Sequence, residues 1–302
     1  MTKLKGYIKK EERKKILLLC DDIRVHSGIA TMAREIVVNS AHTFNWFNVG
    51  AAIKHPDIGK ILDISEELNK QIGIDDVDVK ILPSNGYGDA TLIRKLLKTE
   101  DIDAIMIFTD PRYWTWLFEI EREIRSQVPI IWYNIWDDYP APLYNKNYYR
   151  SVDTLLAISK QTKTINEIVL DEYANDKLIK YVPHGIDEKV FYPIDPANED
   201  FIKFKNETLK NKELDFVAFF NSRNIARKHP HDLVLGYRLF CDMIGEEAAK
   251  KCGLVMHTQV VDQHGTDLKA LKEALCDPAY VNILFSTNRL TSAQLNCLYN
   301  IA

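Results

Sequence analysis

Short, uninterrupted apolar runs alternate with amphipathic stretches along the whole chain, and this alternation restricts the possible folds more than any other feature. The N-terminal runs lie at residues 15–22, 44–53, 79–83, 104–110, 129–138 and 154–159. Helical patterns accompany them at residues 29–38, 90–98, 114–126 and 160–172. Continuous apolar runs suit parallel strands that are covered on both faces. The βαβα order therefore predicts a doubly wound α/β sheet.

A second series of the same kind begins after Pro193. Strands are expected at residues 213–220, 253–260 and 281–286, and helices at residues 230–244, 266–275 and 291–301. Prolines 183, 193 and 196 mark the join, so we predict two Rossmann-like domains, residues 1–192 and residues 193–302. A doubly wound domain usually contains about five strands. The second series has fewer, so we expect the second domain to be cut short.

The composition argues against several classes of protein. The chain has 39 Lys and Arg against 43 Asp and Glu, a net charge of −4, so only a local groove could attract nucleic acid. The five cysteines include no CxxC pair, which argues against a disulfide framework or structural zinc and fits a reducing compartment. No secretory signal is present, and no apolar run reaches about 18 residues. We therefore expect a cytoplasmic protein with no transmembrane segment.

The stretch FFNSRNIARKHP carries three cations, Arg223, Arg227 and Lys228, and no acidic residue. It lies between an expected strand and an expected helix, where free backbone N–H groups and the helix dipole favour an anion. Arg223 offers a planar bidentate donor and Lys228 a point charge, a combination that suits a diphosphate. A solvated basic loop is the alternative. The absence of GxxxxGK[ST] excludes a P-loop.

Two further turns are candidates for ligand contact. Ser27 and Gly28 lie where the first strand turns into a helix, so backbone N–H groups there either contact a ligand or simply begin the helix. The absence of GxGxxG disfavours a nicotinamide cofactor. His184 lies in a Pro-His-Gly turn at the domain junction, where it could reach a ligand between the domains. Alternatively this turn is a hinge, with Phe191 and Tyr192 packing one domain on the other.

Asp137 and Asp138 follow the run at residues 129–138, at the sheet edge where open α/β sheets bind ligands. Adjacent side chains point apart, so one of the two is expected to face the ligand. The eight histidines show no metal-ligand spacing, and the DxD at residues 101–103 precedes a strand, so we expect no metal site. No GxSxG nucleophile motif occurs.

Taken together, these pieces resemble glycosyltransferase family 4, retaining nucleotide-sugar enzymes of the GT-B fold. LLAISKQTK followed by YVPHGIDEKVFYP is similar to the domain junction of that family, and NSRNIARKHPHDLVLGYRLF resembles its Arg-x4-Lys loop and the following helix. LTSAQLNCLYNIA is similar to its next helix, and HSGIATMAREI matches its glycine loop more loosely. The resemblance spans nearly the whole chain.

The resemblance implies two Rossmann-like domains with the active site between them and a nucleotide-diphosphate sugar as co-substrate, without a required metal. It implies that Arg223 and Lys228 bind the donor diphosphate, with Ser27 and Gly28 near the donor phosphate and sugar. Residues from Asn288 to Leu290 would lie near the nucleotide base, and His184 near the donor. Arg227, one residue off the spacing, is expected to face solvent or the other domain.

Two departures from the family pattern affect the chemistry. The place of the usual His-Asp pair reads Trp136-Asp137, which leaves Asp137 as the candidate catalytic residue. The Glu-x7-Glu segment of the family would follow Ala302, so we expect the 302-residue form to be weakly active or inactive unless those carboxylates are supplied.

Other functions stay open at this point. An epimerase would lack a separate acceptor, and a phosphorylase would need phosphate or a pyridoxal cofactor. A catalytically silent protein that binds a sugar nucleotide is an alternative from another class. For a glycosyltransferase the acceptor also stays open among a glycan, a protein, a lipid-linked sugar and a modified nucleic-acid base.

Overall fold

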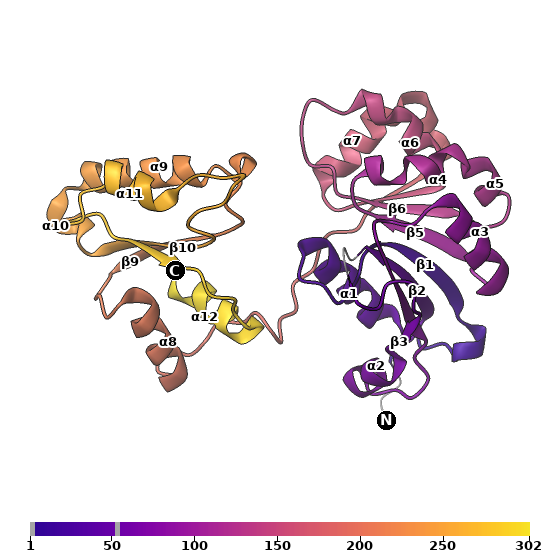
Figure 1. The fold of residues 1–302 in the computed structure, drawn as a ribbon, viewed down its shortest axis with the longest axis horizontal. Helices are drawn as coiled ribbons and strands as arrows, with labels where there is room; N and C mark the ends of the chain where they lie inside the picture. Colours follow the sequence, from indigo (N-terminus) through magenta and orange to yellow (C-terminus); the bar gives the residue numbers. More distant parts are fainter. Residues whose placement is uncertain (1–3, 52–54) are drawn as a thin grey trace. The chain divides into compact units, whose positions relative to one another are not determined.

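The computed structural model describes residues 4–51 and 55–302 (Figure 1). They divide into two compact units, Met1–His184 and Gly185–Ala302. Within the described residues, no helix combines the length and apolarity needed to cross a membrane.

An eight-stranded sheet of order β3-β4-β2-β1-β5-β6-β7-β8 forms the centre of the N-terminal unit. Only β3 pairs antiparallel, at one edge, and the other neighbouring strands are parallel. The strands are β1 (Lys14–Asp21), β2 (Phe44–Ala51), β3 (Leu62–Asp63), β4 (Val79–Ser84), β5 (Ala104–Phe108), β6 (Ile130–Asn134), β7 (Thr154–Ala157) and β8 (Leu178–Tyr181).

Helices cover both faces of this sheet, with α3 to α7 on one face and α1 and α2 on the other (Figure 1). Their bounds are α1 (Gly28–Ser40), α2 (Ser65–Ile72), α3 (Ala90–Thr99), α4 (Thr115–Glu119), α5 (Glu121–Arg125), α6 (Lys146–Arg150) and α7 (Lys160–Leu170).

Strand β1 shows why the centre of its sequence, residues 16–20, is continuously apolar. Leu17 and Leu19 pack into the core beneath α3 to α7, whereas Leu18 and Cys20 pack into the core on the opposite face, with Val37 of α1. Successive side chains of a strand point to opposite faces. A strand buried on both sides therefore needs apolar residues at every position. The predicted doubly wound α/β fold is confirmed.

The sequence-based elements differ from the structure in several places. The helix expected at residues 114–126 is divided into a 3-10 turn (Pro111–Trp114), α4 and α5, because Ile120 leaves helical geometry at φ −108° and ψ 16°. The apolar residues of the expected helix still pack into one core. Their spacing alone therefore does not reveal the break. The antiparallel strand β3 was not expected. The expected strand at residues 44–53 ends at Ala51, and its last two residues lie outside the described ranges.

The C-terminal unit has a three-stranded parallel sheet of order β11-β10-β9. Helices α9, α10 and α11 pack on one face, and α8 and α12 on the other (Figure 1). The predicted helix at residues 230–244 agrees with α9 residue for residue. The elements are α8 (Glu199–Leu209), β9 (Phe216–Asn221), α9 (Pro230–Ile244), α10 (Glu246–Ala249), β10 (Cys252–His257), α11 (Leu268–Leu275), β11 (Ile283–Ser286) and α12 (Ser292–Ile301).

The boundary between the units falls between His184 and Gly185, rather than between Tyr192 and Pro193. Phe191 and Tyr192 belong with the C-terminal unit. The ring of Phe191 packs edge-on against Tyr299 at 5.9 Å, and the backbone N–H and C=O of Tyr192 both bond the side chain of Asn296. The proline-rich segment covers both positions, so composition alone does not choose between them.

Candidate functional site

The carboxyl edge of the N-terminal sheet carries Asp21, at the end of β1, and Ser27, the residue before α1. The Ser27 hydroxyl accepts from the N–H of Ala30 at 2.9 Å and donates to the Asp21 carboxylate, which also accepts from the Tyr87 hydroxyl at 2.8 Å. Burial, together with this carboxylate, raises the pKa of Tyr87, so its hydroxyl stays protonated. The Ser27 side chain is therefore committed to holding the turn. The free donors at the start of α1 are backbone N–H groups.

Gly28 occupies an open position at this turn. A Cβ built on it has no other heavy atom within 4 Å, and its backbone is outside the left-handed region. Neither local packing nor backbone geometry requires a glycine here. Its lack of a side chain leaves the first turn of α1 accessible.

His184 packs beside two aromatic rings at the carboxyl ends of β5 and β6. Its ring centroid lies 6.1 Å from that of Phe108 and 5.6 Å from that of Tyr133. The Tyr133 hydroxyl donates to the carbonyl of Val182 at 2.9 Å and so anchors the chain just before the Pro-His-Gly turn. Burial lowers the pKa of His184, so the imidazole is neutral at neutral pH.

Asp137 lies on an exposed loop after β6. Hydrogen bonds from the side chains of Asn134 and Gln161 hold the backbone of this loop. Buried Asn134 donates to Asn166 at 2.6 Å and to the Tyr149 hydroxyl at 3.0 Å, and it accepts from the N–H of Trp136. The side chain of Gln161 bonds the Asp137 carbonyl. This network was not expected from the sequence, although an asparagine at the end of an apolar run was the available signal.

Three polar residues lie side by side at the carboxyl edge of the C-terminal sheet. Asn221 on β9, His257 on β10 and Ser286 on β11 occupy matching register positions. Nδ1 of His257 and Oγ of Ser286 are 2.9 Å apart, and burial lowers the pKa of His257. Sequence analysis did not single out these residues, because each ends a different strand and only pairing of the strands brings them together.

The Arg223–Lys228 loop leaves this same edge. A 3-10 turn (Ala226–Lys228) carries Arg227 and Lys228, which are exposed, and within the described residues neither forms an ion pair. Arg223 is also exposed, but its Nε lies 3.5 Å from a carboxylate oxygen of Asp262. The loop itself lacks an acidic residue, as its sequence shows, yet the loop after β10 supplies one.

Asn288 and Leu290 differ in their surroundings. Asn288 is exposed, whereas Leu290 is partly buried against the core formed by α8, α12 and the sheet. Thr291 follows and begins α12 with a capping box to Gln294. Asn288 therefore has a side chain accessible to a ligand, and Leu290 contributes to packing.

The sequence matches no protein-family model and no curated protein sequence. Solved structures are similar to it in fold. HepE from Anabaena, in complex with UDP and glucose, has a TM-score of 0.59 and 14% identity over 95% of this chain and 71% of its own. A glycosyltransferase from Rickettsia africae has a TM-score of 0.62 and 13% identity, covering 96% and 72%. A UDP-forming trehalose-phosphate synthase from Burkholderia xenovorans has a TM-score of 0.61 and 12% identity, covering 96% and 78%.

The chain has the GT-B fold.

One group of potential metal ligands occurs in the described part of this GT-B chain. His229, His231 and Asp232 lie at the start of α9, with their ligand atoms within 4.8 Å of one another. Nδ1 of His229 is 3.1 Å from the Asp232 carboxylate, and Nε2 of His231 is 3.5 Å from it. His229 and Asp232 are largely exposed, and the cations Arg227 and Lys228 precede them. These contacts join side chains at a helix start, where a carboxylate is favourable.

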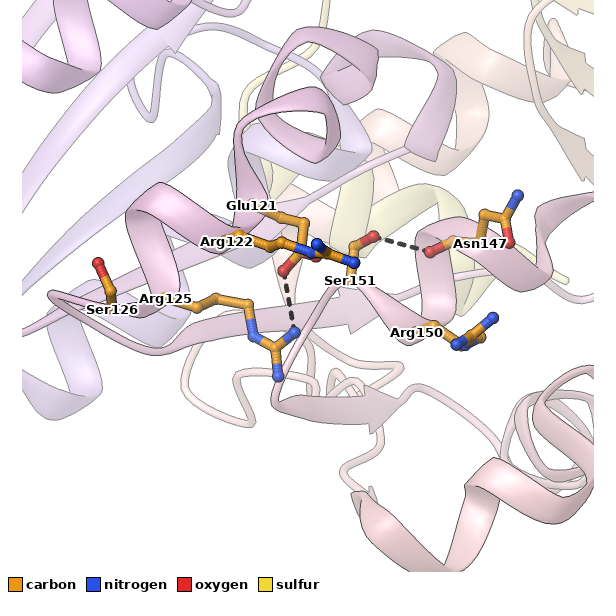
Figure 2. A pocket seen from close by; sticks show the side chains of 7 residues that line it. All are labelled: Glu121, Arg122, Arg125, Ser126, Asn147, Arg150 and Ser151. Atoms are coloured by element: carbon orange, nitrogen blue, oxygen red, sulfur yellow. Dashed lines mark hydrogen bonds and ion pairs between the residues drawn. The ribbon is translucent and has the colours of Figure 1, made fainter.

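A hollow of about 570 Å³ lies at the opposite, amino edge of the N-terminal sheet, and Figure 2 shows the side chains that line it. Arg125 bonds Glu121 at 2.9 Å and also Asp153, which precedes β7 and accepts from the N–H of Ile130 at the start of β6. Open α/β sheets bind ligands at their carboxyl edges, and none of the predicted site residues lines this hollow. Its lining residues are Glu121, Arg122, Arg125, Ser126, Asn147, Arg150 and Ser151.

Proposed function

We propose that this protein is a glycosyltransferase that moves a sugar from a nucleotide-diphosphate sugar to an acceptor. The observation that carries the proposal is the Arg223–Lys228 loop, which presents exposed cations at the carboxyl edge of a parallel sheet in a GT-B fold. A fold neighbour, HepE, forms a complex with UDP and glucose. A uridine diphosphate sugar is therefore the first donor to test.

The chemistry of sugar transfer needs the cations that this loop supplies. The bond between the anomeric carbon and the diphosphate oxygen breaks, and negative charge grows on the departing diphosphate. Fixed cations stabilise that charge most when they are already in place. We assign this role to Arg223, as a planar donor of two hydrogen bonds, and to Lys228, as a point charge. In this proposal no metal ion is essential.

We assign the remaining candidate residues to other parts of the donor. The free N–H groups at the start of α1, beside Ser27 and Gly28, suit a phosphate or a sugar hydroxyl. His184, neutral and packed beside aromatic rings, suits a hydrogen bond to the sugar. Asn288 is an exposed side chain of its loop that suits a contact with the base, with Leu290 holding the loop. Asp137 is the candidate catalytic carboxylate, and we propose that transfer retains the anomeric configuration.

The Gly28→Ala variant distinguishes an effect on donor binding from an effect on the stability of the fold. The new methyl group meets no protein atom, so the free energy of unfolding should stay the same or rise by about 0.5 kcal/mol. If a donor approaches the N–H of Gly28 closely, donor affinity should fall roughly tenfold. Calorimetric titration with UDP-glucose and a thermal unfolding curve measure the two quantities. Unchanged donor affinity would remove Gly28 from the proposed site.

The proposed activity is tested by incubating the protein with UDP-glucose and GDP-mannose and measuring nucleoside diphosphate release. The assay includes candidate acceptors from each class: oligosaccharides, peptides, lipid-linked sugars and hydroxymethylated DNA. We expect release that depends on one donor and one acceptor class, with the anomeric configuration of the product retained when it is analysed by NMR. Tight binding of a sugar nucleotide, without hydrolysis or transfer in any mixture, would instead identify a silent binding protein.

A further inference from the structure

The loop between β10 and α11, residues 258–267, packs directly on the Arg223–Lys228 loop. The N–H of Ala226 donates to the carbonyl of His264 at 3.2 Å. Asn224, fully buried, donates to the carbonyls of Gln259 and Thr266 at 3.0 and 2.7 Å and accepts from the N–H of Thr266 at 3.1 Å. The two loops therefore form one hydrogen-bonded unit at the carboxyl edge of the sheet.

Close packing also joins the two loops. A Cβ added to Gly265 would lie 2.3 Å from the backbone oxygen of Asn224 and 2.4 Å from its side-chain oxygen. Gly265 also has φ outside the left-handed region, so its lack of a side chain serves the contact with Asn224 and not a strained turn. Consequently the position of the second loop is determined by the first.

Asp262 is the charged residue that this packing brings to Arg223. One carboxylate oxygen of Asp262 accepts from the N–H of His264 at 2.9 Å, and the other lies 3.5 Å from Nε of Arg223. The His264 N–H, with help from Arg223, lowers the pKa of Asp262, which keeps the carboxylate ionised. The Asp262 side chain is only 13% exposed, against 65% for that of Arg223. The acid is thus held by its loop, and the arginine extends past it.

The nitrogen of Arg223 that lies nearest to Asp262 determines whether Asp262 competes with a ligand or positions the arginine for it. Asp262 approaches Nε at 3.5 Å, and within the described residues neither terminal nitrogen of Arg223 forms a hydrogen bond. A carboxylate that competed with a bound diphosphate would form a close bidentate pair with Arg223, as Glu123 does with Nε and a terminal nitrogen of Arg94 at 2.7 Å. The single, longer contact with Asp262 favours a guanidinium orientation in which Nε faces the carboxylate, and it leaves the N–H donors of the two terminal nitrogens for a ligand.

We propose that Asp262 is a positioning residue, which holds Arg223 through Nε so that its terminal nitrogens face the diphosphate of a nucleotide ligand. This inference rests on the proposed function, because it assumes that Arg223 binds a diphosphate. It adds the β10–α11 loop to the site as the element that orients the arginine.

Asp262→Asn is the decisive variant, because the amide oxygen can still accept from the His264 N–H while the negative charge is lost. We expect it to weaken binding of UDP and of inorganic diphosphate about tenfold and to leave the thermal unfolding midpoint unchanged. Asp242→Asn is the matched control, since Asp242 pairs with Nε of Arg238 at 2.8 Å on α9 of the same unit. We expect this control to leave both affinities unchanged.

An Arg223→Lys background shows whether Asp262 acts through Arg223. Lysine keeps the charge but has no Nε to be held, so Asp262→Asn should then have little effect on the affinity for UDP. A similar loss of affinity in both backgrounds overturns the positioning role. Unchanged or tighter binding of UDP by the single Asp262→Asn variant also overturns the positioning role, provided that Arg223→Ala still weakens binding of UDP. Arg223→Ala without any loss of binding overturns the proposed function and, with it, this inference.

Discussion

Asn224→Ala is expected to lower the free energy of unfolding of the C-terminal unit by about 3 kcal/mol. The side chain is fully buried, and its removal leaves the carbonyls of Gln259 and Thr266 and the N–H of Thr266 without their partner. Each buried polar group that loses its partner costs about 1 to 3 kcal/mol, and water that enters the relaxed loop recovers part of this. Few single substitutions in loops reach this magnitude.

Unfolding of the two units can be followed separately by two different measurements. All five tryptophans lie in the N-terminal unit, at positions 46, 114, 116, 132 and 136. Their fluorescence therefore follows unfolding of that unit, whereas amide hydrogen exchange in β9 and β10 follows the C-terminal unit. We expect faster exchange in β9 and β10 and an unchanged fluorescence midpoint. Asn288→Ala, at an exposed asparagine, is the control and should change neither. Unchanged exchange in Asn224→Ala would show that its hydrogen bonds contribute little to stability.

Arg223→Ala is expected to weaken binding of UDP by about 2 to 3 kcal/mol, or roughly 30- to 150-fold. The substitution removes a planar cation whose terminal nitrogens are free for two charge-assisted hydrogen bonds. Arg223→Lys should lie between the alanine variant and the original protein, because it keeps the charge but loses the bidentate geometry. Isothermal titration calorimetry with UDP and GDP measures these affinities and shows which base is preferred.

Arg227→Ala is the matched control for this prediction. Arg227 lies in the same loop, is exposed and, like Lys228, has no ion pair in the part of the chain that the structure describes. The Arg227→Ala substitution therefore removes the same charge from the same segment, and we expect an effect on UDP affinity of less than about twofold. Equal losses in Arg223→Ala and Arg227→Ala would mean that the loop acts only as a general positive field, without a specific diphosphate contact.

The order and type of most long elements could be predicted from local sequence. The continuous apolar run at residues 16–20 of β1, and a 3.6-residue apolar period in α9, are properties of the segments themselves. The short elements were harder to predict from local sequence. Strand β3 has two residues, and the break at Ile120 changes one residue in a stretch whose apolar spacing continues across it.

The candidate site was predicted in part. The position of Arg223 and Lys228 on a strand-to-helix turn follows from the sequence, because local patterns define both the strand and the helix. The assignment of these residues to a diphosphate stays a prediction. Asp262, Asn224 and His257 were missed, since their roles depend on partners that lie in other loops and strands.

The sequence by itself determined that this chain folds as parallel, doubly covered sheets, and it determined where a basic loop leaves the second of them. The physical reason is that apolar periodicity is local and repeats over many residues. Only the tertiary structure decided how that basic loop is held and which nitrogens of Arg223 remain free. Irregular loops have no period, and their backbone polar groups must find partners wherever packing brings them. Here packing provides Asn224 for the backbone groups and Asp262 for Arg223.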